Sequence, residues 1–201
     1  MGRMRVRAAI FAGAVLLVVA GIVLLATALG GSTDSGDSKQ SQAAADPAAA
    51  RAYAGAPAPL RSLYDQRNRL LGGGADAFKA RIAALRGHPV IVNKWASWCG
   101  PCRAEFPVFQ KASIQAARRA AFVGVDSTDN DGDALTFLGK FPVPYPSYRD
   151  ADLKVARVFH GVGAFPTTAF YDAKGKLAYV HQGPYESPAK LLGDLKRYTG
   201  A

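Results

Sequence analysis

The sequence predicts an α/β domain in which a mixed central sheet is flanked by helices. Short apolar runs with the length of buried strands, at 90–94 and 121–126, are interspersed with stretches of helical spacing. Two alternating strands at 168–171 and 176–181 surround the turn residues 172–175, which is typical of a hairpin. Runs arranged in this way are typical of a sheet that helices cover on both faces.

The first residues predict a membrane segment. A basic segment, 1–7, carries three arginines, and the uncharged apolar stretch 8–29 follows it. A stretch of this length can span the bilayer core, and the positive-inside rule places the arginine end in the cytoplasm. Ala26-Thr27-Ala28 also resembles a cleavage site, so an uncleaved anchor and a signal peptide both remain open. Both predict an extracytoplasmic domain, and the anchor predicts a single-pass protein of the cell membrane.

The region after the apolar stretch predicts a tether and then the folded domain. Residues 30–59 are rich in Gly, Ser, Ala, Asp and Pro, a composition typical of a flexible linker. The domain is expected to cover 60–201. It opens with helical spacing at 60–71 and 75–85, which predicts a helical N-terminal extension.

Four further helices are expected inside the domain. The first starts at the cysteine pair and contains Pro107, the second precedes the proline-rich stretch 141–146, and the last begins after Ser187-Pro188. Their expected ranges are 99–118, 133–140, 155–160 and 189–198.

The charge of the chain excludes little. The formal net charge is +10, from 25 Lys and Arg against 15 Asp and Glu. Such a surplus is typical of a basic soluble surface and would favour acidic partners or a membrane surface. Because no cluster combines basic with aromatic residues, we expect no nucleic-acid partner.

The two cysteines, Cys99 and Cys102, are the only ones in 201 residues. They lie at a predicted strand-to-helix junction, where unpaired backbone N–H groups and the helix dipole favour a thiolate. The thiolate is the nucleophile of disulfide exchange. The spacing therefore predicts a dithiol redox centre in which Cys99 attacks a disulfide and Cys102 resolves the mixed disulfide.

A Cys-x-x-Cys pair can serve other purposes in a protein. A structural disulfide closing so small a loop would stabilise little. A zinc site would need further ligands, and the sequence has neither a second Cys-x-x-Cys nor a His-x-His pair. A copper-handling module remains an alternative because thiolates suit Cu(I), although no Met or His neighbours the pair. We expect no metal and no organic cofactor.

The run 92–107, which contains Trp98-Cys99-Gly100-Pro101-Cys102, resembles the TlpA/ResA-like thiol-disulfide oxidoreductases, a membrane-anchored branch of the thioredoxin superfamily. The stretch 161–168 is similar to the family segment whose proline is cis and faces the cysteines. Together the matching segments cover about 85–199. The resemblance implies a thioredoxin-like fold with a helix-containing insertion.

The resemblance also implies roles for individual residues. In the family, a glutamate at the position of Glu105 tunes the cysteines and assists proton transfer. The residues expected to contact a client are Trp98, Gly100, Pro101, Phe165 and Pro166. Asn93 occupies the place where thioredoxin itself has a buried acid. The helical segment at 60–85 departs from the family, which usually enters the domain through a β-hairpin.

The function expected from these features is extracytoplasmic reduction of disulfides in client proteins. By resemblance, the clients include apocytochrome c during cytochrome c maturation, and a membrane electron donor restores the dithiol. A Cys-Gly-Pro-Cys sequence, which the reducing thioredoxin also uses, favours reduction. The alternative enzymatic function is that of an oxidase that forms disulfides.

Overall fold

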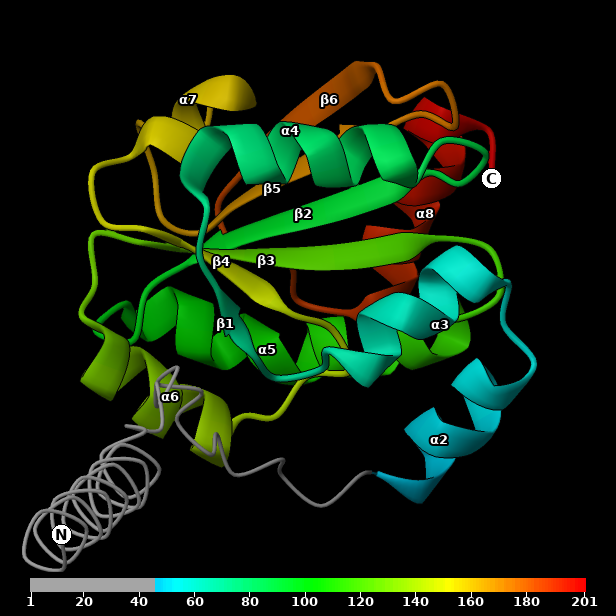
Figure 1. Cartoon of the computed structure of the whole chain (residues 1–201), viewed down its shortest axis with the longest axis horizontal. Helices are drawn as coiled ribbons and strands as arrows, with labels where there is room; N and C mark the ends of the chain where they lie inside the picture. Colours follow the sequence, from blue (N-terminus) through cyan, green and yellow to red (C-terminus); the bar gives the residue numbers. More distant parts are fainter. Residues whose placement is uncertain (1–45) are drawn as a thin grey trace, which may run out of the picture. The chain divides into compact units, whose positions relative to one another are not determined.

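The computed structural model describes residues 46–201 as a six-stranded sheet with helices on both faces (Figure 1). The predicted basic segment, the apolar stretch and the first part of the linker lie outside the described residues. The strand order is β1-β4-β3-β2-β5-β6. The strands are β1 (Leu70–Leu71), β2 (Val90–Trp95), β3 (Ala121–Ser127), β4 (Ser147–Asp150), β5 (Thr167–Tyr171) and β6 (Leu177–Gln182).

Strand β2 lies at the centre of the sheet and makes it mixed. It pairs in parallel with β3 and antiparallel with β5, so Asn93 is opposite Gly124 on one side and Thr168 on the other. All six residues of β2 are buried. The predicted α/β architecture with a mixed central sheet is therefore confirmed.

The helices cover two faces, as Figure 1 shows. One face carries α4 (Gly74–Ala84) and α7 (Lys154–Val158), and the other carries α5 (Gly100–Gln115), α6 (Asp131–Lys140) and α8 (Pro188–Thr199). Alternate strand residues point to opposite faces. The core on the α5 face accordingly contains Ile91, Trp95, Phe106, Phe122 and Phe170, and the core on the α4 face contains Phe78, Val92, Val123, Phe159 and Ala169.

The predicted linker is wrong over its last part. Pro47–Ala54 form helix α2, which Asp46 caps by accepting a hydrogen bond from the Ala48 amide at 2.8 Å. Tyr53 is buried, and its hydroxyl donates to the Ser113 carbonyl of α5 at 3.2 Å. The alanine-rich composition that suggested a tether favours a helix once such a contact holds it. The folded domain therefore includes residues 46–59, which the prediction placed in the linker.

The predicted helix over 60–71 is also shorter than expected. Helix α3 spans Ala58–Asp65, and the chain then turns through Asn68, whose φ is 58°, into β1. The Asn68 side chain donates to the Leu138 carbonyl at 3.0 Å and accepts from the Val143 amide at 3.2 Å. These tertiary hydrogen bonds stabilise the turn that ends the helical stretch.

The other predicted elements appear with small shifts at their ends. Helix α5 continues through Pro107 and ends at Gln115, three residues before the predicted end. Helix α6 begins two residues early, because the Asn130 side chain caps it by accepting from the Asp133 amide at 3.0 Å. Among helices within residues 46–201, none combines the length and the apolar composition that crossing a membrane requires.

Candidate active site

The two cysteines lie where the sequence places them, between β2 and α5. Cys99 is the N-cap of α5, and a disulfide joins it to Cys102 in the first turn. The Cys99 sulfur also accepts a hydrogen bond from the Cys102 amide at 3.1 Å. Cys99 is only 3% exposed and Cys102 is fully buried. The pair thus sits at the positive end of a 16-residue helix, where a thiolate on Cys99 would be stabilised.

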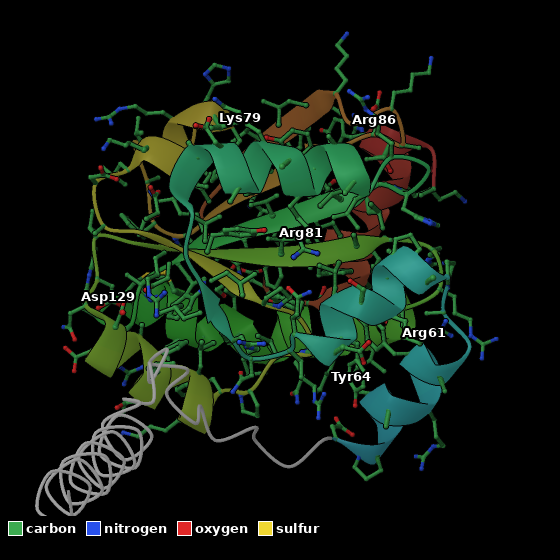
Figure 2. All side chains as sticks on the ribbon, viewed as in Figure 1. Arg61, Tyr64, Lys79, Arg81, Arg86 and Asp129 are labelled. Carbon is green, nitrogen blue, oxygen red and sulfur yellow. A yellow bond between two sulfur atoms is a disulfide. The ribbon has the colours of Figure 1, made fainter. Side chains whose placement is uncertain are left out.

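The turn that precedes Cys99 is held by the loop after β3. Asp129 accepts hydrogen bonds from both the backbone N–H and the hydroxyl of Ser97, the latter at 2.9 Å. The Trp98 indole N–H donates to the Thr128 carbonyl at 3.0 Å. Figure 2 shows Asp129 in this loop beside α6. Asp129 was not among the predicted site residues, because its only signal in the sequence is an acidic residue shortly after a predicted strand.

The segment 161–166 forms the second wall of the site. The Phe165–Pro166 bond is cis, as predicted. The Phe165 ring packs against Trp98 with ring centroids 5.0 Å apart. Trp98 and Val162 are the exposed large apolar residues of the described chain. The structure therefore brings the cysteine turn and the cis-proline segment together under an apolar rim.

The other predicted client-contact residues differ in exposure. Gly100 and Pro101 lie exposed in the first turn of α5, whereas Pro166 is buried. Trp98 and Phe165 touch each other. Contact of these residues with a client stays a prediction.

Glu105 lies one helical turn after Cys102, on the same side of α5. It is fully buried, and its Oε2 accepts from the Tyr185 amide at 3.1 Å. Burial raises the pKa of Glu105 from 4.5 to about 8, against the lowering effects of the Tyr185 amide and the Asn93 side chain. Its Oε1 has no hydrogen-bond partner among residues 46–201. A proton is therefore held next to Cys102 at neutral pH.

Further buried polar groups lie near Glu105 or opposite Asn93 in the sheet. Within the described chain, the Asn93 amide, the Tyr145 hydroxyl and the Thr168 hydroxyl make no hydrogen bond that meets ordinary geometry. Burial raises the pKa of Tyr145 well above its usual value, and the negative charge of Glu105 raises it further. Tyr145 was not among the predicted site residues, because its position follows from the proline-rich loop and not from a local pattern.

Asp126, at the end of β3, is a second buried carboxyl that the sequence analysis missed. Burial raises its pKa to about 8, and the neighbouring charge of Asp129 adds to the effect. It lies opposite Trp95 in the sheet. In residues 46–201, no group of three or more His, Cys, Asp or Glu side chains is placed to hold a metal ion.

Comparison with known proteins identifies relatives for most of the chain. The family model described as Redoxin matches residues 46–195. The thiol:disulfide interchange protein DsbE of Pseudomonas fluorescens biotype C is 40% identical over 102 residues, covering 50% of this chain and 55% of that protein. The thiol-disulfide oxidoreductase ResA of Oceanobacillus iheyensis is 29% identical over 111 residues, covering 54% and 56%. The chain thus spans about half the length of the curated relatives it matches.

Solved structures agree on the fold. A thioredoxin family thiol:disulfide interchange protein from Chlorobium tepidum is 30% identical with a TM-score of 0.52, covering 58% of this chain and 83% of that one. The exposed lipoprotein thioredoxin Etrx1 from Streptococcus pneumoniae strain TIGR4 is 25% identical with a TM-score of 0.52, covering 58% and 89%. The predicted thioredoxin-like fold and the resemblance to ResA-like thiol-disulfide oxidoreductases are confirmed.

Proposed function

The chain belongs to the Redoxin family, and on that premise we propose that it exchanges disulfides with client proteins through Cys99 and Cys102. The observation that carries the proposal is the position of the Cys99–Cys102 disulfide at the start of α5, beside the cis-Pro166 segment. Backbone N–H groups at a helix start favour a thiolate, and the disulfide shows that the two sulfurs are within bonding reach.

In the proposed reaction, the Cys99 thiolate attacks one sulfur of a client disulfide. A Cys99–client mixed disulfide forms, and the second client sulfur leaves as a thiolate that takes up a proton. Cys102, as thiolate, then attacks the Cys99 sulfur and releases the first client sulfur as a thiol. The client gains two electrons and two protons, and the Cys99–Cys102 disulfide is formed.

Glu105 supplies a proton acceptor for the second step. Cys102 is fully buried, so its thiol needs a base that is also inside the protein. Because burial raises the pKa of Glu105 to about 8, close to the ordinary pKa of a thiol at about 8.5, proton transfer between them is nearly balanced. Glu105 is mostly protonated at neutral pH, so its ionised fraction, which grows as the pH approaches 8, takes the Cys102 proton as Cys102 attacks.

The proposal extends to location and partners. The basic segment 1–7 and the apolar stretch 8–29 support a single-pass membrane anchor with the domain outside the cytoplasm. A membrane dithiol donor would return two electrons and two protons to the Cys99–Cys102 disulfide. The resemblance to TlpA/ResA-like proteins favours clients such as apocytochrome c, whose cysteine pair must be reduced before haem is joined.

Substitution of the two cysteines tests the proposed reaction. We expect Cys99→Ser to lower the rate of insulin-disulfide reduction to the uncatalysed rate, a loss of about 1,000-fold or more, because no nucleophile remains. Cys102→Ser should instead accumulate a mixed disulfide with the client, seen on a non-reducing gel. Activity that persists without Cys99 would overturn the assignment.

The reduction potential of the pair tests the direction of exchange. Equilibration of the full chain in dithiothreitol buffers should give a value near or below about −250 mV, as for reducing thioredoxins. A value near about −120 mV, typical of a strong oxidant, would make the protein a disulfide-forming oxidase. A pair that never forms an internal disulfide would favour copper handling.

A further inference from the structure

Lys94 is a lysine inside the central strand. It lies in β2, five residues before Cys99, and its side chain is fully buried. Because alternate residues of a strand face opposite sides, Lys94 shares its face with Val92 and points away from α5. Every neighbour of Lys94 in β2 other than Asn93 is apolar, so a buried ammonium here needs a specific reason.

The Lys94 ammonium is bound entirely by the segment 161–166. Its Nζ donates to the Gly161 carbonyl at 2.6 Å and to the Ala164 carbonyl at 2.8 Å. It also lies 3.6 Å from the centroid of the Phe165 ring. An ammonium has three donors and is attracted to an aromatic face. These three contacts satisfy the charge without a carboxylate hydrogen bond.

Asp150, at the end of β4, is the acidic group that acts on Lys94, and β3 lies between the two strands in the sheet. The negative charge of Asp150 raises the pKa of Lys94, while burial, the larger effect, lowers it to about 8. The Asp150 carboxylate is already bound by the Ser127 hydroxyl at 2.9 Å and by the amides of Val155 and Ala156 at 2.7 and 2.9 Å. Asp150 therefore holds the start of α7, and the hydrogen bonds of Lys94 go to the cis-proline segment.

The contacts of Lys94 join both walls of the site. The bound segment carries Phe165, whose ring packs against Trp98, and Pro166, which leads into β5. Lys94 and Cys99 lie on the same short stretch of chain, so fixing the segment to Lys94 also fixes it relative to the cysteines. The Thr167 hydroxyl donates to the Ala164 carbonyl at 2.8 Å, but only Lys94 reaches this segment from the cysteine-bearing strand.

We propose that Lys94 is a positioning residue, which holds the 161–166 segment against the cysteine turn so that an extended client segment docks with its disulfide at Cys99. This inference rests on the proposed disulfide exchange. Lys94 touches neither the client nor the reacting sulfurs, so it acts on client docking and not on the sulfur chemistry.

Three variants of the full chain test the proposal. Lys94→Met keeps the unbranched shape and removes the donors, and Lys94→Gln keeps a shorter donor and serves if the methionine variant does not fold. Lys79→Met is the matched control, because Lys79 is an exposed lysine of α4 (Figure 2) that pairs with Asp76 at 3.4 Å. All three are compared with the unsubstituted chain by thermal unfolding before assay.

Kinetics separate docking from chemistry. For Lys94→Met we expect the KM for insulin to rise about tenfold, with kcat unchanged within about twofold. Hydroxyethyl disulfide is too small to need the segment, so Lys94→Met should reduce it at a rate within about twofold of the unsubstituted chain. Lys79→Met should reduce both insulin and hydroxyethyl disulfide at rates within about twofold of the unsubstituted chain. Equal losses with both substrates, or no loss with insulin, would overturn the proposal.

Hydrogen exchange tests the same idea without activity. The amides of Val162, Gly163 and Phe165 should exchange about tenfold faster in the oxidised Lys94→Met chain, and those of α5 should not change. Unchanged exchange in the segment would overturn the inference even if the protein reduces insulin. If the unsubstituted chain reduces no disulfide, the proposed function fails, and faster exchange would still support a segment held by Lys94.

Discussion

Asn93 and Lys94 are neighbours in β2, but their side chains lie on opposite sides of the sheet and differ in how well they are hydrogen-bonded. Asn93 faces α5 and makes no hydrogen bond of ordinary geometry with its side chain within residues 46–201, as is also true of Tyr145 and Thr168 nearby. Lys94, on the opposite side, is bound by two carbonyls and an aromatic ring. The neutral amide thus makes no hydrogen bond of ordinary geometry, although it acts on the pKa of Glu105 and Tyr145, and the charged ammonium is bound by three contacts.

This difference suits the two sides of the sheet to different roles. Polar groups with few fixed partners can change protonation without breaking a network, and Glu105 lies among them next to Cys102. Groups with all donors used resist movement, which suits the support of the cis-proline segment. The proton transfer proposed for Glu105 thus lies on the α5 side of β2, and the positioning proposed for Lys94 lies on the opposite side.

The largest effect in this comparison is expected from Glu105→Gln. The amide cannot accept the Cys102 proton, so the rate of insulin reduction should fall about 10- to 100-fold while the Cys99 mixed disulfide still forms. The pH dependence of this rate near pH 8 should disappear, because burial places the pKa of Glu105 there. A variant with the rate and pH profile of the unsubstituted chain would remove Glu105 from the mechanism.

The same substitution should change how stability depends on pH. The pKa of Glu105 is about 8 in the folded state and 4.5 ordinarily, so between these values only the unfolded state loses the proton. Its contribution to stability is complete below about pH 4.5 and is lost as the pH rises to 8, by about 1 kcal/mol per pH unit. Urea unfolding at pH 5 to 7.5 should show a smaller decline for Glu105→Gln. Asp126, whose raised pKa acts in the same direction, is common to both proteins.

A smaller effect is expected from Gly124→Ala, which tests whether unpaired groups reflect loose packing. Gly124 lies opposite Asn93 in the sheet, and a Cβ there would overlap the Ser147 side chain, to which the Trp95 indole donates at 3.1 Å. We expect a loss of about 2 kcal/mol in the free energy of unfolding. The control Gly139→Ala, in open space on α6, should stabilise by about 0.5–1 kcal/mol. Tolerance of alanine at both positions would indicate spare room beside Asn93.

The smallest effect is expected from replacing the unpaired groups themselves. Asn93→Val and the nearly isosteric Thr168→Val should each raise the free energy of unfolding by about 1 kcal/mol or leave it unchanged, because each removes buried polar atoms without a partner. Chemical denaturation measures both. A loss of more than about 1 kcal/mol would show that the amide or hydroxyl is satisfied in solution, and the contrast with Lys94 would weaken.

The parts of the site that follow from local pattern could be predicted from the sequence. The apolar run before the cysteines predicts β2, the Cys-x-x-Cys spacing predicts the redox pair, and the position three residues after Cys102 places Glu105 one turn away. The cis bond before Pro166 follows from the family resemblance and is confirmed. The junction of β2 and α5 by itself fixes the positions of the two cysteines and of Glu105.

The parts that depend on distant contacts could not be predicted. Helix α2 is stable because Tyr53 contacts α5, and β1 is two residues long and exists through its pairing with β4. Lys94 and Asp129 act on residues at least 32 positions away in the chain. A lysine in a strand whose residues other than Asn93 are apolar was a visible signal, but its partners are backbone carbonyls, which leave no mark in a sequence.

The burial of Cys99 limits which disulfides can react. Cys99 is 3% exposed and lies beneath an apolar rim, in which Trp98 is 58% exposed. A client sulfur must approach along the line of the bond to be broken, so it has to reach past this rim. In the proposed exchange, a disulfide at the surface of a client or in an extended segment can protrude past the rim, whereas a disulfide enclosed in a protein core cannot. The depth of the Cys99 sulfur would therefore favour accessible client disulfides over enclosed ones.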